Sequence, residues 1–204
     1  MIVVHTGGQR TEEWFAAKAG VPSASNADQV LTASGNLSSS ATRYMCSLLA
    51  ERRGIFENNV PETEWMIRGR ELEDEARGYL AFDHDLEVVQ VDWVLNDDES
   101  AGCSPDGLAE LDGEPIGVEI KCPKASTHIS YLLNGTLPTA YKPQVHWSLA
   151  VTGLPSWLFV SYYPGLDPLV VRVSRDRYTQ KMLAAMQQFV EQLNVADARL
   201  GRST

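Results

Sequence analysis

Cysteine is scarce in this sequence, and long apolar runs are missing from it. The three cysteines, Cys46, Cys103 and Cys122, form no C-x-x-C pair, which argues against a disulfide framework and against a zinc or iron–sulfur site. No apolar run approaches the roughly 20 residues of a membrane-spanning helix. The N-terminal segment MIVVHTGGQR has neither the basic region nor the cleavage site of a secretory signal. We therefore expect reduced thiols and a soluble, cytoplasmic protein.

Basic residues are also few, since 17 Lys and Arg stand against 27 Asp and Glu and give a net charge of -10. Nonspecific coating of a nucleic acid depends on Lys and Arg that neutralise phosphates, so the composition argues against that role. Enzymes that hold divalent metals concentrate carboxylates, however, and a local basic track can coexist with an acidic exterior. With 204 residues, 44% of them hydrophobic, the chain can bury a sizeable core, and we expect one domain over residues 1–204.

The order of helical and extended segments indicates a mixed α/β fold. Apolar residues at helical spacing predict helices over residues 11–19, from 23 or 25 to 31, and over 40–53, 64–82, 127–133, 139–152 and 176–193. β-rich runs predict strands over residues 87–95, 101–103, 108–111, 116–121, 156–163 and 168–174. We expect a turn to join 101–103 to 108–111, the last two strands to pair antiparallel, 54–63 to be a loop and 199–204 to fray.

Candidate chemistry is concentrated around one predicted hairpin. Asp106 lies in a Pro-Asp-Gly turn, and the strand 116–121 carries Glu119 and Lys121 on one face. Two carboxylates at one sheet edge suit Mg²⁺, which takes one or two carboxylates and keeps its other positions for water and substrate phosphate. Such a metal lowers the pKa of a bound water, and Lys121 could orient or deprotonate that water. Each piece alone is common as an ordinary turn or a solvated ion pair, but the ordered combination is more specific.

Two regions outside the hairpin are weaker candidates. Glu73 shares a helix face with the apolar Ala76 and Leu80, and a buried carboxylate needs a cation or hydrogen-bond donors. The alternative for Glu73 is a solvated surface glutamate. Lys18 and Ser25 stand near the start of a predicted helix, where free N–H groups favour a phosphate. The alternative for this pair is plain helix capping beside a solvated lysine.

Together these segments resemble a known family. Residues 104–108 (SPDGL) and 119–123 (EIKCP) resemble the motif of the PD-(D/E)xK nuclease superfamily, in the form found in the phage lambda exonuclease and YqaJ-type viral recombinase family. Three further segments resemble parts of that family in colinear order: 14–25, 69–73 and 140–145. The resemblance covers most of residues 11 to 163.

The resemblance implies a fold, an activity and a set of site residues. The fold would be a restriction-endonuclease-like core, a small mixed sheet flanked by helices. The activity would be a Mg²⁺-dependent 5′-to-3′ exonuclease that digests linear double-stranded DNA to mononucleotides and leaves 3′ overhangs for phage recombination in the bacterial host. The implied metal ligands are Asp106, Glu119 and the Ile120 carbonyl, the implied catalytic residues Lys121, Glu73, Gln144 and Tyr141, and the implied 5′-phosphate ligands Lys18, Ser25 and Ser104.

The resemblance also implies cofactors and partners. Two Mg²⁺ ions, replaceable by Mn²⁺, would act at the ends of duplex DNA inside a homotrimeric ring, beside a phage single-strand annealing protein. One departure is that Lys18 stands where the lambda enzyme has arginine, and lysine binds phosphate without a bidentate fork. The alternatives are a RecB-like or structure-specific nuclease and a noncatalytic DNA-end-binding protein. Three cysteines fall short of an iron–sulfur cluster, and the intact carboxylate pair argues against a dead site.

Overall fold

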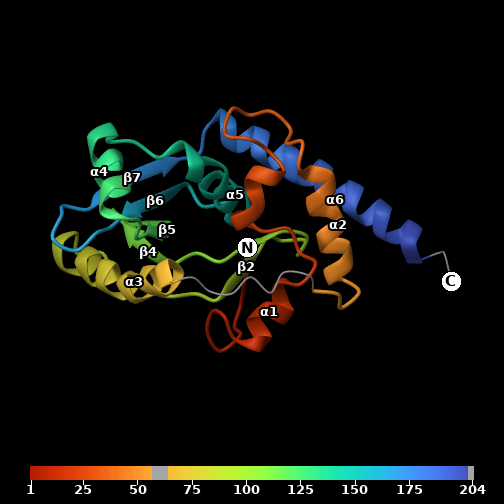
Figure 1. Ribbon diagram of the computed structural model, residues 1–204, viewed down its shortest axis with the longest axis horizontal. Coiled ribbons are helices and arrows are strands. Elements are labelled where there is room, and N and C mark those ends of the chain that lie inside the picture. The colour runs from red at the N-terminus through yellow and green to blue at the C-terminus, as the bar shows by residue number, and fades with distance from the viewer. Residues whose placement is uncertain (57–63, 202–204) are drawn as a thin grey trace.

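Two small β-sheets flanked by helices make up the computed structural model, which describes residues 1–56 and 64–201 (Figure 1). The first sheet is antiparallel, with the order β1 (Ile2–Val4), β2 (Trp93–Leu95) and β3 (Gly102–Cys103). The second has the order β4 (Gly107–Leu111), β5 (Glu114–Lys121), β6 (Ser156–Ser161) and β7 (Leu169–Ser174). Strands β5 and β6 are parallel, whereas the outer pairs are antiparallel. The expected mixed fold, with a small sheet between helices, is confirmed.

Helices surround both sheets. They are α1 (Glu12–Lys18), α2 (Ala41–Glu51), α3 (Glu64–Asp83), α4 (Ala125–Asn134), α5 (Lys142–Thr152) and α6 (Arg177–Gly201), with 3-10 segments η1 (Ala24–Gln29) and η2 (Thr139–Tyr141). The Thr11 side chain caps α1 by accepting a hydrogen bond from the Trp14 N–H at 3.1 Å. Pro143 in the first turn and Gly153 in a left-handed conformation delimit α5. Within residues 1–56 and 64–201, no helix is long and apolar enough to cross a membrane.

Strand β5 lies inside the four-stranded sheet and is buried on both faces. Val118 and Ile120 pack with Ala76 and Leu80 of α3. Glu119 alternates with these residues, so its side chain emerges on the opposite face of the strand. Because side chains alternate with a period of two, the register that buries the apolar pair also places the polar residues of β5 together.

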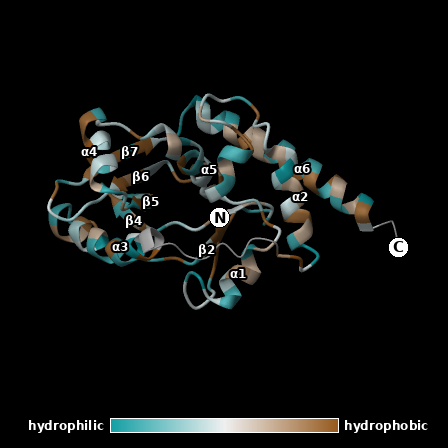
Figure 2. Ribbon diagram, in the orientation of Figure 1, coloured by the Kyte–Doolittle hydropathy of each residue, from teal (hydrophilic) through white to brown (hydrophobic). Residues whose placement is uncertain are grey.

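A second core lies around α5 and α6. Val145, Trp147 and Leu149 of α5 are fully buried in it. Figure 2 shows apolar and polar residues alternating along α6, as expected of a helix with one face on the core. The predicted apolar stripe of α6 is buried at every position: Tyr178, Met182, Ala185, Met186, Phe189 and Leu193.

The strand predicted over 87–95 is shorter in the structure. Only Trp93–Leu95 pairs as a strand, while Val89 makes an isolated bridge with Leu108. The carbonyl of Val91 accepts a hydrogen bond from the Gln9 side chain at 2.9 Å instead of pairing with a strand. A side chain distant in sequence has therefore replaced part of the expected ladder.

Residues 101–103 and 108–111 are not two arms of one hairpin, because β3 pairs with β2 whereas β4 pairs with β5. The three residues after β3 therefore connect the two sheets. Three further predictions were wrong. Strand β1 was missed, η1 is a 3-10 segment rather than an α-helix, and α6 continues to Gly201 instead of ending near residue 193. Part of the predicted loop, residues 57–63, lies outside the described residues.

Candidate active site

Asp106, Glu119 and Lys121 meet at one edge of the four-stranded sheet. Asp106 precedes β4, and its N–H donates to the Val118 carbonyl at 3.0 Å while its Oδ2 accepts the Ile120 N–H at 2.6 Å. The side chain of Glu119 is buried, and Lys121 Nζ donates to Glu119 Oε1. The structure thus brings together the carboxylates and the lysine that the sequence placed on one hairpin.

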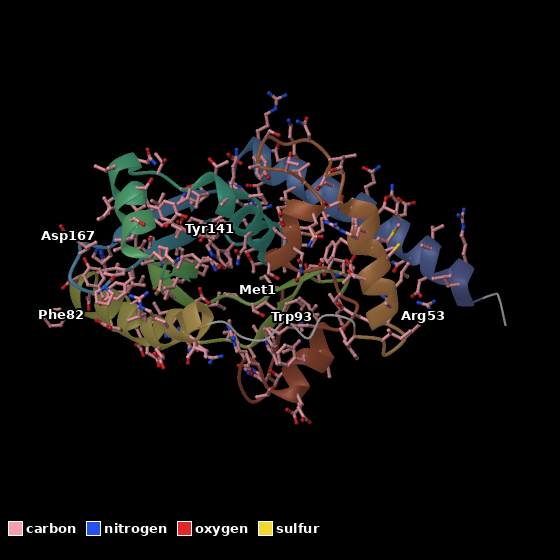
Figure 3. The ribbon with its side chains drawn as sticks, viewed as in Figure 1. Met1, Arg53, Phe82, Trp93, Tyr141 and Asp167 are labelled. Atoms are coloured by element: carbon pink, nitrogen blue, oxygen red, sulfur yellow. The ribbon has the colours of Figure 1, made fainter. Side chains whose placement is uncertain are left out.

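Residues at the start of α5 complete this edge. Gln144 Nε2 donates to Glu119 Oε1 at 2.5 Å. The ring of Tyr141, at the end of η2, has its centroid 5.5 Å from Lys121 Nζ and 5.2 Å from the Phe159 ring. Figure 3 shows Tyr141 where α5 meets the four-stranded sheet. Tyr141 and Gln144, both proposed from the resemblance, therefore adjoin the carboxylate and lysine of β5.

Burial and mutual repulsion shape the charges of this cluster. Burial raises the pKa of Glu119 to about 7 against the opposing effect of Lys121, and burial also raises the pKa of Asp106. Burial and the neighbouring Asp106 raise the pKa of Glu73, on α3, to about 7. Burial alone would lower the pKa of Lys121, but Glu119 and Asp106 outweigh it and raise that pKa, so the ammonium is retained.

These residues fit a divalent cation with few protein ligands. Among the described residues, no group of three or more His, Cys, Asp or Glu side chains is arranged to hold a metal ion. Asp106 and Glu119, with Glu73 close enough to influence the charge of Glu119, are nonetheless carboxyls whose ionised forms burial disfavours despite the neighbouring Lys121. Mg²⁺ is bound by one or two carboxylates and otherwise by water and phosphate. A divalent cation would favour the ionised forms of these carboxyls, which burial disfavours.

Lys18 and Ser25 line a cavity of about 300 Å³ between α1 and α2. Lys18 Nζ lies 3.6 Å from the centroid of the Trp14 ring and 5.1 Å from that of Trp93, which is labelled in Figure 3. Burial lowers the pKa of Lys18 to about 8. The hydroxyls of Ser25 and Ser23 are 3.1 Å apart. A partly desolvated cation and two hydroxyls are donors that suit a phosphate group.

Ser104 lies two residues before Asp106, in the segment that joins β3 to β4. Its Oγ is buried and has no hydrogen-bond partner among the described residues. The preceding Cys103 is fully buried, and its pKa, raised by burial to about 12, responds to both Glu119 and Lys18. The segment joining β3 to β4 therefore lies within electrostatic reach of both sites, and it carries an unsatisfied hydroxyl.

Two arginines at the site were missed from the sequence. Arg77 of α3 makes a long contact of 3.4 Å from Nη1 to the main-chain oxygen of Asp106, and it pairs with Asp74. Arg10, in the loop before α1, acts with Arg77 to oppose the raised pKa of Glu73. The spacing of four residues between Glu73 and Arg77 is a signal that could have been used. Arg10 has a positive φ of 71° in a loop, where no periodicity points to it.

Comparison with known proteins identifies the family. A family model described as the YqaJ-like viral recombinase domain matches residues 13–155, well over half of the chain. The chain belongs to this family. The resemblance read from the motifs is therefore confirmed, and among curated proteins no sequence match to this YqaJ-like domain was found.

Solved structures agree with the family. The YqaJ-like domain is similar to an alkaline exonuclease, LHK-Exo, from Laribacter hongkongensis, with 31% identity and a TM-score of 0.81 over 94% of this chain and 97% of that chain. A crystal structure of LHK-Exo in complex with dAMP matches equally well. A phage-related exonuclease from Haemophilus somnus 129PT, with 14% identity and a TM-score of 0.53 over 90% and 94% of the two chains, shares the fold.

Proposed function

We propose that this YqaJ-like domain is a metal-dependent exonuclease that digests linear double-stranded DNA from 5′ ends. The observation that carries the proposal is the convergence of Asp106, Glu119 and Lys121 with Gln144 at one sheet edge. Membership of the YqaJ-like family and similarity to an alkaline exonuclease support a DNA exonuclease role. The products would be mononucleotides and a duplex with a 3′ single-stranded overhang.

Asp106 and Glu119 would hold Mg²⁺ together with the Ile120 carbonyl. In a strand, the N–H and C=O of one residue point to the same side. Because the Ile120 N–H donates to Asp106, the Ile120 carbonyl also points to the Asp106 side of β5. When bound, Mg²⁺ supplies charge neutralisation at the phosphate and a more acidic water. We extend the proposal to two ions, with Glu73 facing the second and Mn²⁺ able to replace Mg²⁺.

The protein side chains would orient the reacting groups. Beside Glu119 and Asp106, the Lys121 ammonium would donate a hydrogen bond that orients water and stabilises charge on the phosphate. Gln144 fixes Glu119 by donating to Oε1. Tyr141 lies beside the Lys121 ammonium and limits the directions in which it can point.

Selection of 5′ ends would come from the cavity at Lys18. Its ammonium and the Ser25 hydroxyl would bind a terminal 5′-phosphate, with the unsatisfied Ser104 hydroxyl as a third donor. A strand fixed by its terminal phosphate at this cavity presents its first phosphodiester to Asp106 and Glu119. This arrangement supports 5′-to-3′ cutting with release of one nucleotide at a time.

The assembly and the partner form a further part of the proposal. We propose a homotrimer around duplex DNA and a phage single-strand annealing protein that receives the exposed strand, in the cytoplasm of a bacterial host. Light scattering tests the assembly, with an expected mass of about three times 22.5 kDa. A strictly monomeric protein at working concentrations would contradict the ring.

A labelling time course tests the activity. Linear duplex labelled at the 5′ or the 3′ end, and closed circular DNA, are incubated with Mg²⁺ or EDTA. We expect Mg²⁺-dependent release of mononucleotides from 5′ ends and no attack on circles. Asp106→Ala should abolish digestion, whereas Glu110→Ala, which removes an exposed carboxylate from the same hairpin, should not. Binding of ends without cleavage by the wild-type protein would instead support a noncatalytic end-binding protein.

A further inference from the structure

Another cavity, of about 340 Å³, lies on the α3 side of the candidate active site. We call it the arginine cavity, because Arg10 from the loop before α1 and Arg70 and Arg77 from α3 line it together with Glu73 and Asp106. Arg70, Glu73 and Arg77 are spaced by three and four residues and so share one face of α3. The cavity therefore shares two carboxyls with the candidate site, yet the exonuclease reaction proposed for that site gives its arginines no role.

Two further carboxylates line this cavity, and each of them has a partner. Asp74 pairs with Arg77, and Asp92 Oδ2 accepts two backbone N–H groups of the loop before α1, at 2.7 and 3.2 Å. Glu73 and Asp106 are the remaining carboxyls of this lining, and both belong to the site that would hold a divalent cation. A divalent cation there would offset their charge, so the loaded site would present the arginine cavity as a positive surface.

The loop that carries Arg10 is held firmly in place. The Gln9 side chain donates to the carbonyl of Val91 at 2.9 Å and to that of Pro105 at 2.8 Å. Pro105 directly precedes Asp106, so the loop is tied to the same turn that supplies the candidate metal ligand. Arg10 therefore starts from a fixed position beside that turn.

Arg10 also connects the arginine cavity with the cavity at Lys18. It influences the pKa of Lys18 as well as those of Glu73 and Asp106. In a protein with a net charge of -10, Lys18 and three arginines thus line the two cavities that adjoin the candidate site. Arginine presents a planar fork of donors that matches phosphate, and a row of such groups suits a phosphodiester backbone.

We propose that the arginine cavity binds a phosphodiester of the cut strand on the 3′ side of the scissile bond. The inference rests on the proposed function, since a 5′-phosphate at Lys18 sets the direction in which the strand runs. A strand that starts at Lys18 and passes Asp106 would carry its next phosphates into the arginine cavity. There Arg70 and Arg10 would hold the phosphate, while Arg77 keeps its contact with Asp106.

Equilibrium binding tests this site apart from turnover. Affinity for a 5′-phosphorylated duplex is measured by fluorescence anisotropy over a range of salt, with Ca²⁺ in place of Mg²⁺ and cleavage monitored on gels. We expect Arg70→Gln to weaken binding roughly tenfold and to reduce the salt slope by about 1. Arg172→Gln is the matched control, because Arg172 pairs with Asp112 and Glu114 at the other end of the sheet and should leave both values unchanged.

Neutral methylphosphonate linkages, placed one at a time along both strands, locate the contact. The affinity of the wild-type protein should fall when one of the two linkages directly 3′ of the scissile bond is neutral. The affinity of Arg70→Gln should not change when that same linkage is made neutral. Arg10→Gln, on a different element, should behave in the same way, so a local defect in α3 could not produce the result. Unchanged affinity and salt slope in both variants, or a matching loss on the complementary strand, overturns the inference.

These assays can reject either proposal without rejecting the other. A wild-type protein that cleaves duplex DNA from 5′ ends, with both arginine variants unaffected, removes the arginine cavity and keeps the exonuclease. A wild-type protein that binds duplex DNA without cutting it, with both variants weakened as expected, removes the exonuclease and keeps the cavity as a phosphate site.

Discussion

Replacing Glu73 with glutamine should stabilise the metal-free protein at alkaline pH. Burial and Asp106 raise the pKa of Glu73 from 4.5 to about 7, so its ionised form is disfavoured in the folded state. A difference of this size corresponds to about 3 kcal/mol at pH 8. Because the Glu73 side chain is only partly buried, we expect about 2 kcal/mol, or an increase in Tm of roughly 4–8 °C for a chain of this size.

The sign of this effect follows from the raised pKa. Below about pH 4.5, Glu73 is protonated in both folded and unfolded chains and costs nothing. As the pH rises from about 4.5 to about 7, the unfolded chain loses the proton first and wild-type stability falls; above about pH 7 the difference is constant. The advantage of Glu73→Gln should therefore be largest at pH 8 and below about 1 kcal/mol at pH 5.

Urea unfolding in EDTA at pH 5 and pH 8 measures this difference. Glu71→Gln makes the same change at an exposed position of the same helix and should leave stability nearly unchanged. Added Mg²⁺ should stabilise the wild-type protein and narrow its gap to Glu73→Gln, because a bound cation offsets the carboxylate charge. The reasoning is refuted if Glu73→Gln is no more stable than wild type at pH 8, or if it gains equally at pH 5.

Three further substitutions probe the cavity at Lys18, the four-stranded sheet and α3. Burial lowers the pKa of Lys18 to about 8, so wild-type affinity for 5′-phosphorylated ends should fall between pH 7 and pH 9, whereas Lys18→Arg should show little change; equal pH profiles would count against the pocket. Gly117→Ala would place a methyl 2.2 Å from the buried Trp157 ring and should lower the free energy of unfolding by about 1–3 kcal/mol. Gly78→Ala, in open space on α3, should raise it by about 0.5–1 kcal/mol; the opposite order in denaturant titrations contradicts this packing.

Local patterns carried most of the fold prediction. The alternation in β5 placed Glu119 and Lys121 on one face, and helical spacing identified the buried stripe of α6, because each pattern lies within one element. The parts that were missed depend on distant partners. Residues 101–103 joined another sheet because β2 pairs with them. The strand predicted over 87–95 was shortened to β2, and in the lost part the Gln9 side chain donates to the Val91 carbonyl.

The candidate site, too, was predicted where it depends on a local motif and missed where it depends on distant contacts. The hairpin motif identified Asp106 and Glu119, and family resemblance supplied Gln144, whose hydrogen bond to Glu119 no spacing rule could reveal. Arg10 escaped notice because its position depends on a loop fixed by contacts more than 80 residues away in sequence. Whether each residue performs its proposed role stays a prediction for the assays described above.

The parallel pairing of β5 and β6 affects when the candidate active site forms during folding. Ile116 pairs with Ser156 and Lys121 with Ser161, so about 40 residues, including α4 and α5, must close a loop before the strands meet. That closure costs chain entropy before contacts compensate it, which makes parallel pairing a slow, late step in folding. Every candidate catalytic residue precedes residue 145, yet a growing chain that ends before residue 156 would lack the strand that supports β5. We expect a chain emerging from the ribosome to remain inactive until β6 has been made.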